Sequence, residues 1–169
     1  MSLILGIDPG FATIGFGFLN KEKDKLTLVD YGIISTEPHQ EFPERLSQIS
    51  QDLSSLLNKY KPSVCAIEKL FFAKNTKTAL DVAQARGVIL ETLNRDKSRL
   101  AGQIFEYTPL QVKNALVGYG HADKNQIQQM VKIILKLNHI PSPDDAADAI
   151  AIAICHCHTN PLAHLSKNK

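Results

Sequence analysis

The stretch that most constrains the fold is Leu3-Ile4-Leu5-Gly6-Ile7-Asp8-Pro9-Gly10, an uncharged run that ends on a carboxylate. It is too short for a helix, rich in branched residues and stopped by Pro9-Gly10, so it predicts a strand buried on both faces of a sheet. Side-chain alternation puts Asp8 on the same face as Ile4. A buried carboxylate is costly unless positive charge or donors meet it. Asp8 therefore either accepts hydrogen bonds in the turn or binds a cation.

Size and composition predict one ordinary domain. The chain has 169 residues, of which 44% are hydrophobic and 21% charged. We expect a single domain over residues 1–158 and a polar tail over residues 159–169. The start of the chain lacks the basic region of a secretory signal, and the apolar run 149–155 is too short to cross a membrane. Three cysteines suggest reduced thiols, so we expect a cytoplasmic protein.

Charge is unevenly distributed along the chain. The net charge is only +2, but residues 69–136 carry eleven Lys/Arg and five Asp/Glu, which leaves that segment at +6. A basic middle third can hold a polyanion, although a solvated helix surface explains the same charge.

Apolar periodicity predicts a mixed α/β fold. Strands are expected at 3–8, 12–20, 26–36, 63–68 and 103–107, with a polar turn at 21–24. Helices are expected from Pro43 to about residue 60, over 78–94, from Pro109, from 124 to about Leu137, and through about His158 at the end. Capping boxes begin at Thr108, Asp123 and Ser142. The order predicts a five-stranded mixed sheet, with three antiparallel strands followed by parallel strands and with helices on both faces.

Four carboxylates are expected to meet at one edge of this sheet. Asp8 and Glu68 end two separate strands, and sites in open α/β sheets collect at the C-terminal edge. Asp145 and Asp148 stand three apart on the last helix, so they share a face. Neighbouring small and apolar residues indicate that this helix packs closely. Asp144 in the first turn is most simply a residue that favours the helix start.

An all-oxygen acidic site of this kind suits magnesium, with manganese as an alternative. Two such ions can stabilise the attacking and leaving oxygens in phosphodiester hydrolysis. The predicted chemistry needs no serine or cysteine nucleophile.

Four motifs together resemble the RuvC family of bacterial Holliday junction resolvases. They are Gly6-Ile7-Asp8-Pro9-Gly10, Ala66-Ile67-Glu68 with Phe71-x-Ala73-Lys74-Asn75, Gln84-Ala85-Arg86-Gly87-Val88, and Asp145-Ala146-Ala147-Asp148-Ala149. The resemblance runs in order from about Leu3 to His158. It implies an RNase H-like fold, a homodimer, divalent metal, and paired symmetric cuts in four-way DNA junctions during recombination and repair. It also implies coupling to the RuvAB branch-migration complex.

The resemblance assigns roles to particular residues. Asp8, Glu68, Asp145 and Asp148 correspond to the catalytic, metal-binding acids. Phe71 corresponds to the aromatic residue that inserts at the junction crossover, and Lys113 and Lys124 to basic residues used on DNA. Asp144 is an added acid beside this set.

The residues themselves also favour DNA binding. Lys69, Lys74 and Lys77 flank Phe71 and Phe72 directly after Glu68. Lysines neutralise phosphates and an exposed aromatic stacks on an unpaired base. We expect stacking from Phe71 and a packing role for Phe72. The apolar helix 78–94 is either a dimer element or a core helix.

Three other interpretations account for parts of the sequence. The first is a junction-binding module that does not cut, against which the four acids argue. The second is an actin-like or sugar-kinase phosphotransferase, because Gly6-x-Asp8-x-Gly10 resembles the first phosphate loop of those folds, but the chain is short and offers no clear second loop. The third is a zinc site at Cys155-His156-Cys157-His158, which is disfavoured because consecutive residues on a helix point in different directions.

Overall fold

The computed structural model describes residues 2–70, 76–95, 100 and 102–159. Five strands and five helices follow one another along these residues. In chain order they are β1 (Ser2–Asp8), β2 (Thr13–Glu22), β3 (Lys25–Ser35), α1 (Phe42–Tyr60), β4 (Val64–Glu68), α2 (Thr76–Arg95), β5 (Ile104–Tyr107), α3 (Pro109–Val117), α4 (Lys124–Ile134) and α5 (Asp144–Thr159).

The strands form one mixed sheet in the order β3-β2-β1-β4-β5. The β1–β2 and β2–β3 pairs are antiparallel, and the β1–β4 and β4–β5 pairs are parallel. The predicted sheet, with three antiparallel strands and then parallel strands, is therefore confirmed. The first strand is central, as its uninterrupted apolar run indicated.

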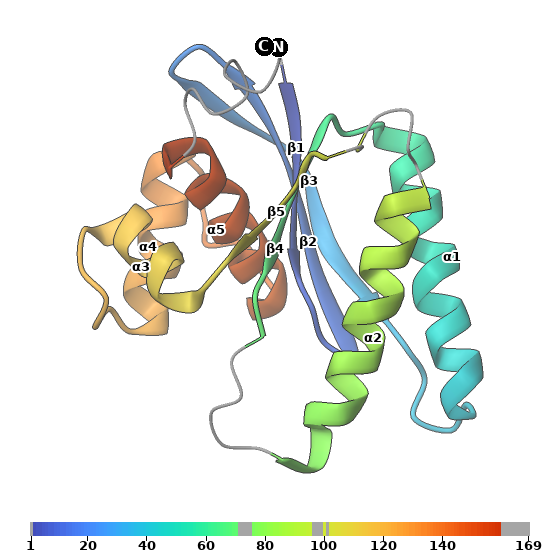
Figure 1. Ribbon diagram of the computed structural model, residues 1–169. Helices are drawn as coiled ribbons and strands as arrows, with labels where there is room; N and C mark the ends of the chain where they lie inside the picture. Colours follow the sequence, from blue (N-terminus) through green and yellow to red (C-terminus); the bar gives the residue numbers. More distant parts are fainter. Residues whose placement is uncertain (1, 71–75, 96–99, 101, 160–169) are drawn as a thin grey trace.

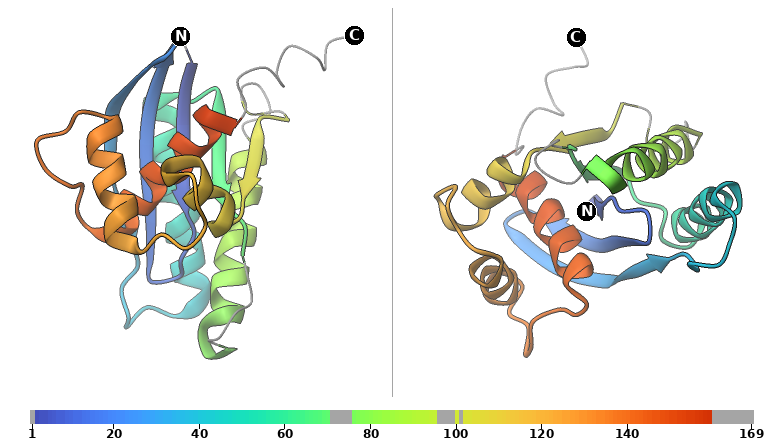
Figure 2. Two further views of the ribbon diagram at one scale, coloured as in Figure 1. Left: turned by 90° about the vertical axis from the view of Figure 1, so that its left-hand side faces the viewer. Right: turned by 90° about the horizontal axis from the view of Figure 1, so that it is seen from below.

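Helices cover both faces of the sheet, which confirms the predicted layering. Helices α1 and α2 lie on one face and α3, α4 and α5 on the other (Figure 1). The views in Figure 2 show α5 running across the sheet, with α3 and α4 outside it. The two faces have separate hydrophobic cores, because alternate side chains of the central strands point to opposite sides.

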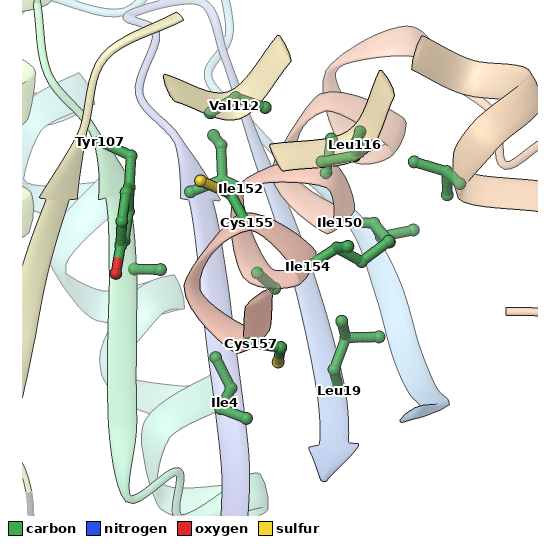
Figure 3. Close-up of a cluster of buried hydrophobic side chains, with 14 of the residues drawn as sticks. Ile4, Leu19, Tyr107, Val112, Leu116, Ile150, Ile152, Ile154, Cys155 and Cys157 are labelled. Carbon is green, nitrogen blue, oxygen red and sulfur yellow. The ribbon is translucent and has the colours of Figure 1, made fainter. Parts of the chain in front are cut away.

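Helix α5 is the centre of the core on its face. Every residue from Ala149 to Cys157 is buried, and Figure 3 shows Ile150, Ile152 and Ile154 among side chains of the sheet and α3. Burial of each such isoleucine contributes about 1.5–3 kcal/mol. The segment from Ala149 to Cys157 is buried on all sides because it is covered both by the sheet and by α3 and α4.

Glycines in β1 and β2 let α5 approach the sheet closely. A side chain at Gly6 would collide with the carbonyl of Ala149, and one at Gly15 with the carbonyl of Asp145. At Gly17 a Cβ atom would lie 2.6 Å from Cγ1 of Ile150. The absence of side chains at these positions brings the start of α5, with its acids, against the ends of β1 and β2.

Two of the three predicted capping boxes are confirmed. Thr108 and Gln111 exchange hydrogen bonds at the start of α3, and Asp123 and Gln126 do so at the start of α4. The third is wrong by one residue. Helix α5 begins at Asp144, so the residue before it is Pro143 and not Ser142, and the Pro143 carbonyl accepts from the amides of the first turn.

Several predicted boundaries shift in the structure. The polar turn expected at 21–24 contracts to Lys23-Asp24, because Lys21 and Glu22 pair with β3. Helix α2 begins at Thr76, two residues early. Helix α4 ends at Ile134 and not at about Leu137, because the chain turns at Lys136, whose φ of 54° lies in the left-handed region. The expected tail from residue 159 begins at the last residue of α5, and residues 160–169 lie outside the described part.

The Cys-His-Cys segment belongs to the core. Cys155 and Cys157 are buried free thiols, and Nδ1 of His156 lies 2.8 Å from the Tyr107 hydroxyl. The Cys157 carbonyl also accepts a hydrogen bond from the Lys21 ammonium. Over the described residues, no helix is both long and apolar enough to cross a bilayer.

Candidate active site

The register of the parallel strands brings the first two acids together. The last paired residues of β1 and β4 are Ile7 and Ile67, so the next residues on the two strands are Asp8 and Glu68. Neighbouring strands lie about 4.8 Å apart, and residues in register point to the same face. Both carboxylates therefore emerge side by side at the C-terminal edge, on the face that α5 covers. The prediction that Asp8 and Glu68 lie at the same edge of the sheet is therefore confirmed.

Helix α5 adds its acids to the same edge. The negative charges of Asp148 and Asp145 act on Asp8, and that of Asp148 acts on Glu68. Asp148 lines a cleft together with Asp8 and Glu68, but Asp145 is not among the residues lining that cleft. The structure thus brings three of the four predicted acids into one cleft and puts Asp145 near enough to interact with Asp8 and Asp148 through charge.

Burial and mutual repulsion raise the pKa values of these acids. Burial, with the charges of Glu68, Asp148 and Asp145 added, raises the pKa of Asp8 from 3.8 to about 8. Burial followed by the charge of Asp148 raises the pKa of Glu68. The pKa of Asp148 also rises through burial, although Lys124 opposes the shift.

The cleft has a volume of about 210 Å³ and two lysines on its rim. Lys113 comes from α3 and Lys124 is the first residue of α4. The other lining residues are apolar and come from α3, α4 and α5: Pro109, Val112, Ile127, Ala151 and Ile152. Charge of both signs thus faces a pocket whose remaining walls are apolar.

Lys124 bridges two acids of α5. Its Nζ atom lies 3.0 Å from a carboxylate oxygen of Asp148 and 3.3 Å from one of Asp144. Nε2 of Gln128 also donates to Asp144, at 3.0 Å. The Gln128 and Lys124 contacts lower the pKa of the Asp144 carboxyl. Asp144 lies in the first turn of α5, as its predicted helix-start role requires, and its side chain also binds α4.

The donor set has the chemistry of a site for hard divalent cations. Carboxylate oxygens are the ligands that magnesium and manganese prefer, and a cation would offset the burial and the repulsion that together raise the pKa of Asp8. Within the described ranges, no three aspartate, glutamate, histidine or cysteine side chains lie close enough together to coordinate one metal ion.

Comparison with known proteins decides the family. The family model described as crossover junction endodeoxyribonuclease RuvC matches residues 4–156. A RuvC of Alkaliphilus oremlandii is 51% identical over 168 residues, 99% of each chain, and one of Halothermothrix orenii is 53% identical over 154 residues, 91% of each chain. The chain belongs to the RuvC family.

A solved RuvC structure agrees with this fold. Thermus thermophilus RuvC in complex with a Holliday junction substrate superposes with a TM-score of 0.84 at 34% identity, covering 94% of each chain. The mixed sheet with helices on both faces is the RNase H-like fold predicted from the motifs.

The residues expected to contact DNA, whether from the RuvC resemblance or from the residues around Glu68, fall into three groups. Lys113 and Lys124 line the acidic cleft, which makes them part of the candidate site. Lys69 is exposed directly after Glu68, and its amide donates to the Tyr107 carbonyl. Phe71, Phe72 and Lys74 lie outside the described residues. Lys77 belongs to α2, but its side chain also lies outside them.

Sequence reasoning missed two residues that contact the site. Arg86 donates from Nε to the carbonyl oxygen of Glu68, at 3.3 Å. Gln128 holds Asp144, as described above. The motif containing Arg86 was visible in the sequence, but nothing in its spacing indicated that α2 lies beneath the end of β4. Gln128 carried no such signal.

Proposed function

We propose that this protein is a crossover junction endodeoxyribonuclease, which resolves Holliday junctions by paired symmetric nicks in recombination and repair. The observation that carries the proposal is the convergence of Asp8, Glu68 and Asp148 in one cleft beside Lys113 and Lys124. Membership of the RuvC family and likeness to a RuvC bound to a Holliday junction support the choice of substrate.

Asp8, Glu68, Asp145 and Asp148 are the residues that would hold the metal. Two Mg²⁺ ions, for which Mn²⁺ can substitute, would supply an activated water and neutralise charge on the departing 3′ oxygen. The raised pKa of Asp8 fits this role, because the carboxyl keeps its proton near neutral pH until a cation favours the charged form.

The lysines of the cleft act on the DNA backbone. Lys113 and Lys124 face the acids across the cleft, where an ammonium can hold the phosphate that is to be cut. The apolar walls exclude bulk water, which strengthens each charged contact. Phe71 would stack on a base at the crossover, and Lys69, Lys74 and Lys77 would contact neighbouring phosphates.

A homodimer matches the near two-fold symmetry of a four-way junction, because two identical sites can then cut two strands. Leu80 on α2 is 70% exposed, which supports this helix as a dimer element. Coupling to the RuvAB complex and action in the cytoplasm complete the proposal.

The direct test is cleavage of a mobile four-way junction against linear duplex, with and without Mg²⁺. We expect paired symmetric nicks in the junction only, and only with the metal. Tight junction binding without cutting under any divalent ion would indicate a non-catalytic module instead. Equal cutting of linear duplex would contradict the proposed selectivity for four-way junctions.

A further inference from the structure

Arg86 lies beneath the end of β4, on the face of the sheet opposite the cleft. Its Nε atom donates to the main-chain carbonyl of Glu68 at 3.3 Å, and one terminal guanidinium nitrogen lies 3.1 Å from Oε1 of Glu106. The second contact is an ion pair without hydrogen-bond alignment. The Arg86 side chain is only 15% exposed, whereas that of Glu106 is 40% exposed, so solvent weakens the ion pair from the Glu106 side.

These contacts join three elements at the point where Glu68 leaves the sheet. Glu106 pairs in register with Ile67, one residue before Glu68. Ile67 belongs to the core shared with α1 and α2, so Glu106 points to the same side, toward Arg86. The amide of Lys69, one residue after Glu68, donates to the Tyr107 carbonyl of β5. The backbone around Glu68 is thus held from below by α2 and from the side by β5.

We propose that Arg86 is a positioning residue for Glu68, which fixes the strand end so that the carboxylate points into the cleft. The inference rests on the proposed nuclease function. Among the described residues, Arg86 is not part of the lining of the cleft, and its contacts are with the main chain of Glu68 and the carboxylate of Glu106. A small displacement of a catalytic group by a distant change can slow a reaction by up to about 100-fold.

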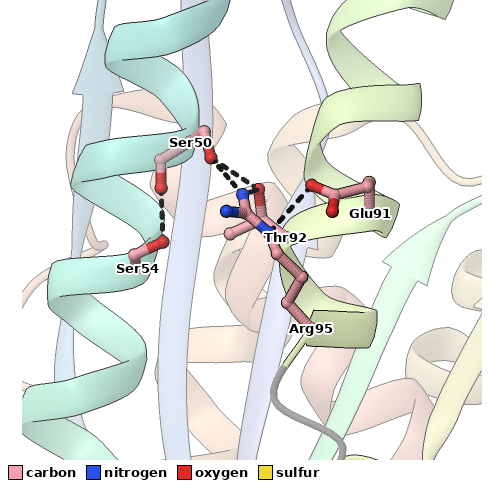
Figure 4. A network of polar contacts seen from close by, with 5 residues as sticks. All are labelled: Ser50, Ser54, Glu91, Thr92 and Arg95. Atoms are coloured by element: carbon pink, nitrogen blue, oxygen red, sulfur yellow. Dashed lines mark hydrogen bonds and ion pairs between the residues drawn. The ribbon is translucent and has the colours of Figure 1, made fainter.

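Arg95 offers a matched control on the same helix. It pairs with Glu91 at 3.0 Å, and one of its terminal nitrogens donates to hydroxyl oxygens of Ser50 and Thr92, which connects α2 to α1 (Figure 4). Each arginine therefore pairs with a glutamate and ties α2 to a neighbouring element. Arg95 stands more than two turns farther along α2 and does not contact β4.

The experiment compares Arg86→Gln, Arg86→Lys, Glu106→Gln and Arg95→Gln. For each variant, three quantities are measured: the single-turnover cleavage rate of a four-way junction against Mg²⁺ concentration, the junction Kd without divalent ions, and the melting temperature. For Arg86→Gln we expect a rate about 10- to 100-fold lower and a higher Mg²⁺ midpoint. Its junction Kd should stay within about twofold, since Arg86 does not face the cleft.

The other variants separate positioning from stability. Arg86→Lys keeps the charge but loses the planar fork, so its rate should lie between those of wild type and Arg86→Gln. Glu106→Gln should slow cleavage in the same direction, and it serves with Arg86→Lys if Arg86→Gln fails to fold. Arg95→Gln should lower the melting temperature slightly and leave the cleavage rate unchanged.

Two results would overturn the inference. One is a folded Arg86→Gln protein that cuts within about twofold of the wild-type rate at every Mg²⁺ concentration. The other is an equal loss of rate in Arg95→Gln, which would mean that α2 acts only through overall stability. Failure of the wild-type protein to cut junctions at all would instead count against the proposed function, so the two failures are distinguishable.

Discussion

The Lys124 ammonium lies 3.0 Å from a carboxylate oxygen of Asp148, across the gap between α4 and α5. Asp148 is half-buried and its pKa is raised by burial, so the lysine partly supplies the positive charge that this group of acids needs. Lys124 also contacts Asp144, which keeps the ammonium at the rim of the cleft. The same side chain therefore competes with a cation for Asp148 and is available to a phosphate.

Replacing Lys124 with glutamine should separate these two effects. Loss of the Lys124 charge should tighten binding of Mn²⁺ to the DNA-free protein, because Asp148 is then free for the cation. The gain should be about three- to tenfold, since the exposure of Lys124 to solvent limits its Coulomb interaction. The same change should slow junction cleavage by about tenfold, because the phosphate loses a cationic partner. Calorimetry measures the first and single-turnover kinetics the second. Lys132→Gln, on the same helix but away from the cleft, is the control. Unchanged Mn²⁺ affinity in Lys124→Gln would contradict the competition.

The raised pKa of Asp8 predicts how stability depends on pH in the absence of metal. The unfolded chain loses this proton near pH 3.8, whereas the folded protein keeps it until about pH 8. The folded state therefore binds more protons between these values, and its stability should fall as pH rises through this window. Asp8→Asn removes this titration, so in EDTA the variant should be more stable than wild type by about 2 kcal/mol at pH 8.

Denaturant unfolding at pH 5 and pH 8 checks this prediction. The stability advantage of Asp8→Asn should shrink at pH 5, because the folded wild type loses less stability there from the titration of Asp8. Added Mg²⁺ should stabilise the wild type more than the variant, because binding to the folded state alone raises its stability. A stability difference that does not change with pH would contradict the shift assigned to Asp8.

Much of this site could be predicted because it follows from local sequence rules. Asp8 and Glu68 each end an apolar run that predicts a buried strand, so they were expected to meet at one sheet edge if the two strands are neighbours, and β1 and β4 do pair. The spacing of Asp145 and Asp148 gave their shared helix face. The contacts of Lys124 and Arg86 could not be predicted in this way. Each joins residues about 20 apart on different elements, and only the packed structure brings them together.

The glycines illustrate a second limit of sequence reasoning. In the sequence, nothing distinguishes Gly15 from the other residues of its alternating strand. In the structure, α5 lies directly over it. A Cβ at Gly10 would collide with the carbonyl of Thr13, so the loop after β1 itself requires the glycine. Close backbone approach leaves no periodic pattern and appears only in three dimensions.

Gly15→Ala tests whether this close approach positions the acids. The new methyl group would collide with the carbonyl of Asp145 and push the start of α5 away from β2. We expect a loss of about 1–3 kcal/mol in unfolding free energy and a lower cleavage rate in the folded protein. Gly87→Ala on α2 is the control, because a methyl group there meets nothing within 4 Å. It should stabilise the helix by up to about 1 kcal/mol. A stable, fully active Gly15→Ala protein would show that α5 tolerates displacement.

The central claim is that the acids gathered at the end of β1 perform the chemistry, and one comparison tests it most directly. Asp8→Asn and wild-type protein are incubated with a four-way junction, first without divalent ions to measure Kd and then with Mg²⁺ to measure cleavage. The account predicts junction binding at least as tight as that of wild type and a cleavage rate lower by about 1,000-fold or more. An Asp8→Asn protein that cuts junctions at a rate near that of wild type would contradict it.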